Sequence, residues 1–382
     1  MARVRVYFAL PALVAALFLS APRLNAADTL PNQIADDAFW KLIENSSEPG
    51  GVFQSENFLS NETGFQAVIP SLNQTTKPDG VYMGVGPEQN FTYIAAIHPK
   101  MAFIIDIRRQ NMLEHMIYKA IFEMSADRAQ FLSRLFSRKR PAGLSEKSTV
   151  DELFNAYLVA EPLDNDAFQK NLQDIQDLLL KKHQFGLSGE DQDDIGHVYT
   201  VFYDFGPDIN YNSSAFRSGR GSGGMPNYAE LMTTTDLQGE KRSYLANEAN
   251  YRFLRDLESR NLIVPLTGDF GGPKAIRAAG QYLKDHDATV TAFYLSNVEQ
   301  YLFQGNGNRN GGWTNFYDNV ATLPLDSSST FIRSAGGGAR RGVFGGAGGM
   351  RAPNVLASMR ETVAAVKSGS IQTYNDLFSI SR

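Results

Sequence analysis

The stretch Val81-Tyr-Met-Gly-Val-Gly-Pro-Glu-Gln-Asn90, followed by Phe103-Ile-Ile-Asp106, decides the fold of this chain. An apolar strand runs into a Gly84-Val-Gly86 turn, helical residues follow, and a second apolar strand ends in an acid. Glycines in such a turn let the backbone approach a ligand, and an acid roughly 20 residues later accepts hydrogen bonds from ribose hydroxyls. The layout therefore predicts a nucleotide-type site at the edge of a doubly wound α/β sheet.

The strand pattern returns later in the chain. Leu262–Leu266 predicts a third strand that runs into Gly268-Asp269, and Thr289–Leu295 predicts a fourth that ends in Ser296-Asn297. Ser328–Arg333 is a candidate fifth strand. Because the carboxyl ends of parallel strands meet at one edge of a sheet, we expect the polar residues that follow these strands to surround one crevice.

Between the second and third strands, apolar residues recur at the spacing of helices rather than strands. Helices are expected at about 109–135, 149–159, 166–182 and 191–203, and we interpret residues 126–225 as a mainly helical insertion. The predicted fold class is therefore α/β, a Rossmann-like doubly wound sheet with a large, mainly helical insertion.

The two ends of the chain are predicted to lie outside an α/β domain of residues 27–334. Residues 1–26 combine a basic start, a short apolar run and a small residue at the cut, which is typical of a signal peptide. The protein is therefore expected to be periplasmic or secreted, with no stable membrane span after cleavage. Residues 335–382 predict a Gly-rich flexible tail, in which Val355–Val366 has the amphipathic spacing of a terminal helix.

The composition excludes several classes of site. The chain has no cysteine, which excludes disulfides, thiolate zinc sites and cysteine nucleophiles. The 5 histidines lack metal-ligand spacing, so no metal is expected. A net charge of −5, spread along the chain, argues against a nucleic-acid partner. The unknown partner is expected to be a small molecule or a protein.

Four segments together resemble a known superfamily. They are Phe58-Leu-Ser-Asn-Glu62, Gly84-Val-Gly-Pro-Glu-Gln-Asn90, Asp106-Ile-Arg-Arg109 and Tyr294-Leu-Ser-Asn-Val-Glu299. In this order they resemble the class I S-adenosylmethionine-dependent methyltransferase-like superfamily, and most closely an uncharacterised bacterial family with that fold. The resemblance covers most of residues 40–334. It implies a methyltransferase-like fold, S-adenosylmethionine as cofactor, and methyl transfer to an unknown substrate.

The resemblance also implies roles for individual residues. The residues implied to bind the cofactor are Gly84, Gly86, Asn90, Asp106 and Asp269. Among them, Asp106 would accept hydrogen bonds from the ribose and Asp269 one from the adenine amino group. Ser296 and Asn297 would lie beside the sulfonium as catalytic residues, where positioning supplies most of the rate.

Three residues of the turn depart from the methyltransferase pattern. Tyr82 stands where an acid is usual, and Glu88 stands where a third glycine is usual. Pro87 removes one backbone donor, and the charge of Glu88 would oppose a cofactor carboxylate. The alternative function is therefore an exported, non-catalytic protein whose crevice binds another ligand or a protein partner.

The same residues also have purely structural interpretations, which the sequence leaves open. Asp106 pairs with one of the arginines that follow it or caps the next helix, and Asn297 and Glu299 cap a helix of their own. For Ser60-Asn61-Glu62 a helix cap is favoured over a wall of the site. Core packing is the favoured interpretation of three aromatic residues, Tyr82, Phe91 and Tyr93.

Overall fold

The computed structural model describes residues 1, 28–214, 225–305, 312–334 and 354–381. The predicted signal peptide after Met1 and the Gly-rich segment after residue 334 lie outside these ranges. None of the helices within them is long and apolar enough to cross a membrane.

Six strands of the described chain form one sheet in the order β3-β2-β1-β4-β5-β6. The strands are β1 (Val81–Gly84), β2 (Met101–Asp106), β3 (Ile263–Thr267), β4 (Val290–Ser296), β5 (Leu325–Arg333) and β6 (Val355–Ser358). The first five are parallel, and β6 runs antiparallel to β5. The strand order reverses between β1 and β4, which is where ligands bind in open α/β sheets.

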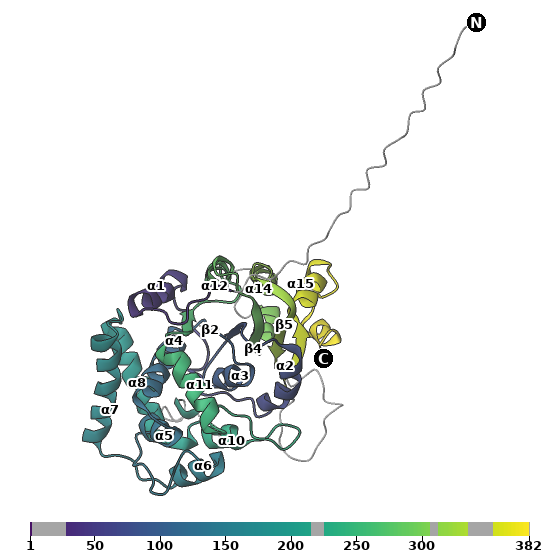
Figure 1. The fold of residues 1–382 in the computed structure, drawn as a ribbon. Coiled ribbons are helices and arrows are strands. Elements are labelled where there is room, and N and C mark those ends of the chain that lie inside the picture. Colours follow the sequence, from purple (N-terminus) through teal and green to yellow (C-terminus); the bar gives the residue numbers. More distant parts are fainter. Residues whose placement is uncertain (2–27, 215–224, 306–311, 335–353, 382) are drawn as a thin grey trace.

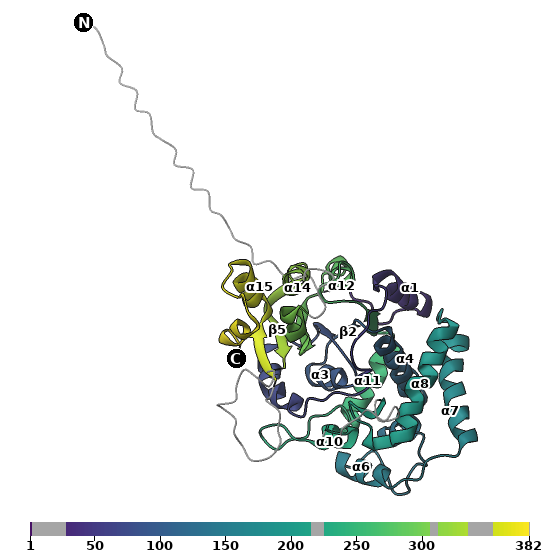
Figure 2. The ribbon, with the colours of Figure 1, turned by 180° about the vertical axis from the view of Figure 1, so that it is seen from behind.

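Helices cover both faces of the sheet (Figures 1 and 2). On one side lie α3 (Gln89–Ile97), α4 (Arg109–Met124) and α11 (Glu248–Ser259), and on the other α12 (Ala275–Asp285) and α14 (Gly312–Val320). The central strands β1 and β2 are buried along their whole length. Burial on both faces explains why these strands read as continuous apolar runs. The α/β expectation is confirmed.

The remaining helices before the insertion and around the sheet are short. They are α1 (Asp36–Ser46), the 3-10 helix η1 (Phe65–Val68), α2 (Ile69–Thr75), α13 (Val298–Gln304), α15 (Met359–Lys367) and the 3-10 helix η5 (Tyr374–Ser379).

Helices fill the chain between β2 and β3. After α4 come α5 (Arg128–Leu135), α6 (Val150–Leu158), α7 (Asn165–Asp177), η2 (Leu178–Lys182), α8 (Gly189–Phe205), η3 (Gly206–Asp208) and α10 (Tyr228–Thr233). The single helix expected over 109–135 is two helices, because the Asp127 side chain accepts a 2.7 Å bond from the Gln130 backbone and starts α5. Both α8 and α11 pack on α4, so the insertion is joined to the sheet through that helix.

The residues after the Gly-rich segment return to the sheet. Val355–Val366 was expected to be one helix in a tail, but its first residues form β6, which pairs Phe331 with Ala357. Helix α15 then begins at Met359, where the Ser358 hydroxyl accepts a bond from the Glu361 backbone. A short apolar strand satisfies the open edge of β5, and this corrects the domain boundary at residue 334.

Candidate functional site

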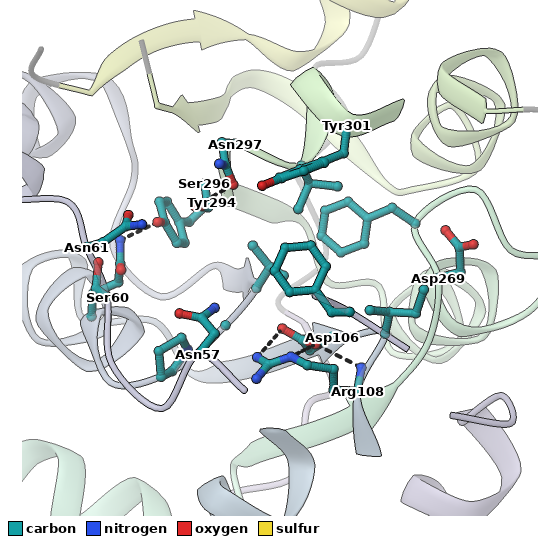
Figure 3. A pocket seen from close by; sticks show the side chains of 18 of the residues that line it. Asn57, Ser60, Asn61, Asp106, Arg108, Asp269, Tyr294, Ser296, Asn297 and Tyr301 are labelled. Atoms are coloured by element: carbon teal, nitrogen blue, oxygen red, sulfur yellow. Dashed lines mark hydrogen bonds and ion pairs between the residues drawn. The ribbon is translucent and has the colours of Figure 1, made fainter. Parts of the chain in front are cut away.

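A cavity of about 200 Å³ lies where β1, β2, β3 and β4 end. In Figure 3, Ser296 and Asn297 lie on one side of it, and Asp106 and Arg108 on the opposite side. The cavity brings together five of the residues singled out from the sequence, which are Gly86, Asp106, Asp269, Ser296 and Asn297. The other two, Gly84 and Asn90, lie behind its wall.

The two glycines of the turn have different surroundings. Gly86 has a φ of +80°, and a Cβ placed on it would come no closer than 4.0 Å to Asn57 Nδ2. A Cβ on Gly84 would lie 1.9 Å from Asn90 Oδ1 and 2.8 Å from the Tyr82 hydroxyl. Gly86 therefore gives the backbone free access to the cavity, whereas Gly84 makes room for side chains behind the turn.

Asn90 holds the turn in shape from within the core. Its Nδ2 donates to the carbonyl oxygens of Val85 at 3.0 Å, Gly86 at 3.0 Å and Pro87 at 2.7 Å. The Tyr82 hydroxyl donates to Asn90 Oδ1 at 2.8 Å. The structure thus gives Asn90 a supporting position behind the turn, and Tyr82, at the position expected for an acid, supports Asn90.

Three aromatic residues near the turn are core residues, as favoured from the sequence. Tyr82, Phe91 and Tyr93 are fully buried. Phe91 packs edge-on against several rings, including Tyr118 at 5.1 Å between centroids. Their packing fixes α3 against the sheet behind the cavity.

Asp106 is paired with Arg108, which was one of its open interpretations. Oδ1 accepts from the Arg108 backbone at 2.9 Å and from Nε at 3.0 Å, and Oδ2 accepts from Nη2 at 3.0 Å. Both side chains are buried, and Arg108 Nη1 also donates to the carbonyl of Glu56. A carboxylate offers roughly four acceptor positions, so Asp106 keeps about one for a ligand.

Glu88 is turned into the core rather than toward a ligand. Its Oε2 accepts a 3.2 Å bond from the Ser60 backbone, and burial raises the pKa of Glu88 to about 8. The carboxyl group is therefore mainly neutral at pH 7, and the expected repulsion of a cofactor carboxylate does not arise. Behind it, burial also raises the pKa of Glu114 and lowers that of His115 to about 4.

The end of β4 is strained and polar. Ser296 has a φ of +47°, a conformation that costs energy for a residue with a side chain. Its Oγ donates to Glu62 Oε1 at 2.7 Å and lies 3.5 Å from Asn297 Oδ1. Within the described chain, α13 has no side-chain cap from Asn297, and Glu299 instead forms a buried ion pair with Arg333 at 2.8 Å. The capping interpretation of these two residues is wrong.

The loop that contains Ser60-Asn61-Glu62 is a wall of the site and not a helix cap. The Ser60 Oγ accepts a 3.1 Å bond from the Glu62 backbone, which closes a turn well before η1 begins. Ser60 and Asn61 line the cavity, and Glu62 lies directly behind Ser296. A cap was favoured because Ser and Asn precede a helix, a signal that local turns share.

Asp269 lies in the part of the cavity wall that follows β3. Its Oδ1 accepts from the Gly271 backbone at 2.9 Å, and its own backbone N donates to Glu48 Oε2 at 3.3 Å. Glu48 Oε1 accepts 2.8 Å bonds from the Lys274 and Ala275 backbones and so covers the start of α12. Asp269 is held at the cavity by this network.

Sequence reasoning missed the segment Gly50–Asn57, which has no regular secondary structure and contributes Val52, Phe53 and Asn57 to the lining of the cavity. Gly51 donates a 2.8 Å backbone bond to Ile107, next to Asp106. The Phe53 ring packs against Tyr301 with centroids 5.4 Å apart. A segment of this kind carries no periodic signal, so the sequence alone could not assign it to the site.

The walls combine aromatic side chains with amides and two carboxylates, Asp106 and Asp269, of which Asp106 is paired with Arg108. Beyond the polar residues above, the lining includes Val52, Phe53, Ile107, Tyr211, Phe270, Tyr294, Tyr301 and Leu302. In the described ranges no group of His, Asp or Glu side chains could hold a metal ion. The cavity is suited to an organic ligand with an apolar, planar part and several hydrogen-bonding groups.

One family model matches the chain. It is described as "Domain of unknown function (DUF7790)", and it matches residues 57–184 and 153–345. No curated protein matches the chain. The matched residues include β1 to β5, together with every cavity residue from Asn57 onward.

Proposed function

The chain belongs to the DUF7790 family of unknown function, and we propose that it is a methyltransferase-like protein whose cavity binds S-adenosylmethionine. The observation that carries the proposal is the convergence of Gly86, Asp106 and Ser296 at the ends of β1, β2 and β4. The order β3-β2-β1-β4-β5 supports a class I methyltransferase-like arrangement of the sheet. The activity proposed is methyl transfer to an unknown small molecule or protein.

The residues present fit this ligand. The open side of Gly86 admits a ligand close to the backbone, and Asp106 keeps about one acceptor position for a ribose hydroxyl. Because the pKa of Glu88 is about 8, a ligand carboxylate near the turn meets a neutral group. When bound, S-adenosylmethionine supplies an electrophilic methyl group.

The protein side of the mechanism is binding and orientation. Phe270 follows Asp269 in the wall and offers an apolar face for a planar base, while Asp269 lies at the same end of the cavity. Ser296 and Asn297 present an hydroxyl and an amide on the side opposite Asp106 (Figure 3). In-line transfer needs little covalent help, so holding donor and acceptor in these positions would supply most of the rate.

Ligand-induced stabilisation tests this proposal. Millimolar S-adenosylmethionine or its demethylated product is expected to raise the melting temperature of the protein, since a ligand that binds only the folded state stabilises it. Asp106→Asn should reduce the shift, measured against the ligand-free variant, while the exposed control Asp37→Asn should keep it in full. The absence of any shift in the parent protein would contradict the proposal.

A second candidate is an exported, non-catalytic binding protein. It is favoured by the buried ion pair of Asp106 and Arg108. Arg108 already uses most of the hydrogen-bond acceptor positions of the carboxylate that was expected to bind a ribose. The predicted signal peptide at residues 1–26 supports the same candidate. N-terminal sequencing of the native protein after cell fractionation tests it: a mature chain starting near Ala27 in the periplasm is expected, and full-length protein in the cytosol would count against it.

A further inference from the structure

The Ser296 hydroxyl and the Glu62 carboxylate form a hydrogen-bonded pair that no sequence motif predicts. We infer that this pair accepts the proton that the methyl acceptor releases. The inference rests on the proposed function and adds a role for Glu62. It also specifies the acceptor as a hydroxyl or amine, groups that release a proton when they become methylated, in contrast to a thioether.

The geometry of the pair places a carboxylate directly behind the cavity wall. The Ser296 hydroxyl, which lines the cavity, donates its hydrogen to Glu62 Oε1 at 2.7 Å. With its proton directed at Glu62, the Ser296 oxygen, which also interacts with the Tyr294 side chain, has lone-pair capacity for a hydrogen bond from a group in the cavity. The φ of +47° at Ser296 shows that the backbone is held in a costly conformation at this point.

The other oxygen of Glu62 is held by a neutral side chain. Gln89 Nε2 lies 3.4 Å from Glu62 Oε2 and also donates to the Tyr294 hydroxyl. Gln89 and Tyr294 line the cavity as well, so Glu62 connects to the cavity through three side chains. Such a network fixes the direction of the carboxylate toward Ser296.

Glu62 differs in one respect from three other buried carboxylates of the molecule. Glu299 is paired with Arg333, Glu248 with Arg128 and Asp106 with Arg108. Among the described residues Glu62, which is 8% exposed, takes part in no ion pair. No arginine or lysine therefore occupies the oxygens of Glu62, and they are available to accept a proton through Ser296.

The proton movement balances. A lone pair of the acceptor oxygen or nitrogen forms the new bond to carbon, and the carbon–sulfur bond electrons remain on sulfur. The acceptor proton passes to Ser296 Oγ while the hydroxyl proton of Ser296 passes to Glu62 Oε1. Ser296 ends as a neutral hydroxyl and Glu62 as a neutral acid. Glu62 is thus a positioning residue that acts through Ser296.

Binding provides a test that does not depend on turnover. The neutral demethylated product and an analogue with an ammonium group in place of the sulfonium methyl are titrated calorimetrically into the full chain. Glu62→Gln is expected to weaken the cationic analogue about tenfold and the neutral product less than twofold, because only the cation interacts with the carboxylate charge. Glu361→Gln, an exposed change on α15, should alter neither.

An assay of methyl transfer completes the test. Labelled S-adenosylmethionine is offered with panels of small alcohols, phenols, amines and thioethers. Labelled ether or amine products are expected from the parent protein, with Glu62→Gln slower by about 100-fold and Glu62→Asp partly restored. Failure of all ligands to bind would overturn both this inference and the proposed function. Binding without transfer, transfer to thioethers alone, or equal behaviour of Glu62→Gln and the parent would overturn the proton-accepting pair alone.

Discussion

The Tyr82 hydroxyl donates to the side-chain oxygen of Asn90 at 2.8 Å, and Asn90 in turn holds three carbonyls of the glycine turn. Removing Asn90 leaves several buried polar groups without partners. We therefore expect Asn90→Ala to lower the free energy of unfolding by about 3 kcal/mol, measured by urea denaturation. Tyr82→Phe removes a single bond and should cost about 1 kcal/mol. Equal effects of the two variants would contradict this account of the turn.

Alanine at the two glycines of the turn should separate stability from ligand binding. Gly84→Ala places a Cβ 1.9 Å from Asn90 Oδ1 and must disturb that network, so a large loss of stability is expected. Gly86→Ala meets open space, and only its φ of +80° costs about 1 kcal/mol. The new methyl group of Gly86→Ala projects to the cavity and should weaken S-adenosylmethionine in calorimetry. Unchanged affinity would place the ligand away from the turn.

The sequence predicted those parts of the fold that depend on patterns of neighbouring residues. The apolar runs around Gly84-Val-Gly86 predicted the strands of the sheet, because buried parallel strands carry a continuous pattern of their own. The positions of Asp106, Asp269 and Ser296 at strand ends followed from that pattern, and all three line the cavity. Strand β6 was missed, since an apolar tetrapeptide before a helix reads as part of that helix.

Long-range pairings could not be predicted from local pattern. Glu62 meets Ser296 across more than 230 residues of sequence, and Glu48 covers the start of α12 from a similar distance along the chain. Asn90 was assigned to the cofactor because of its place after the turn, whereas its side chain points back to the carbonyls before it. Such contacts depend on the packing of whole elements, so they become visible only in the folded chain.

Glu88→Gln tests the neutral state of this buried side chain. In the folded protein the pKa of Glu88 is raised from 4.5 to about 8, so the native state holds the proton more tightly than the unfolded chain. Stability is therefore lost as pH rises from about 4.5 to 8. Glutamine removes this loss, and the variant should gain about 4 kcal/mol over the parent by pH 8.

The comparison is made by urea unfolding of both proteins between pH 5 and 8. The difference in unfolding free energy should be small at the acidic end and grow steadily toward pH 8. Glu258, whose pKa is also raised to about 8 by burial, is unchanged in both proteins and cancels in the difference. A difference that is independent of pH would show that Glu88 is ionised throughout.

The buried pair of Asp106 and Arg108 sets how much of the acid is left for a ligand. Arg108→Met leaves the Asp106 carboxylate buried without its cation and should cost about 3–5 kcal/mol. Asp106→Asn in the same background removes that charge, so the double variant should be more stable than Arg108→Met alone. A double-mutant cycle from urea unfolding measures this coupling, and additive effects would contradict the pairing. Because the acid meets Arg108 before any ligand, a ribose can gain only the remaining acceptor position, and the affinity lost in Asp106→Asn should be modest, about tenfold.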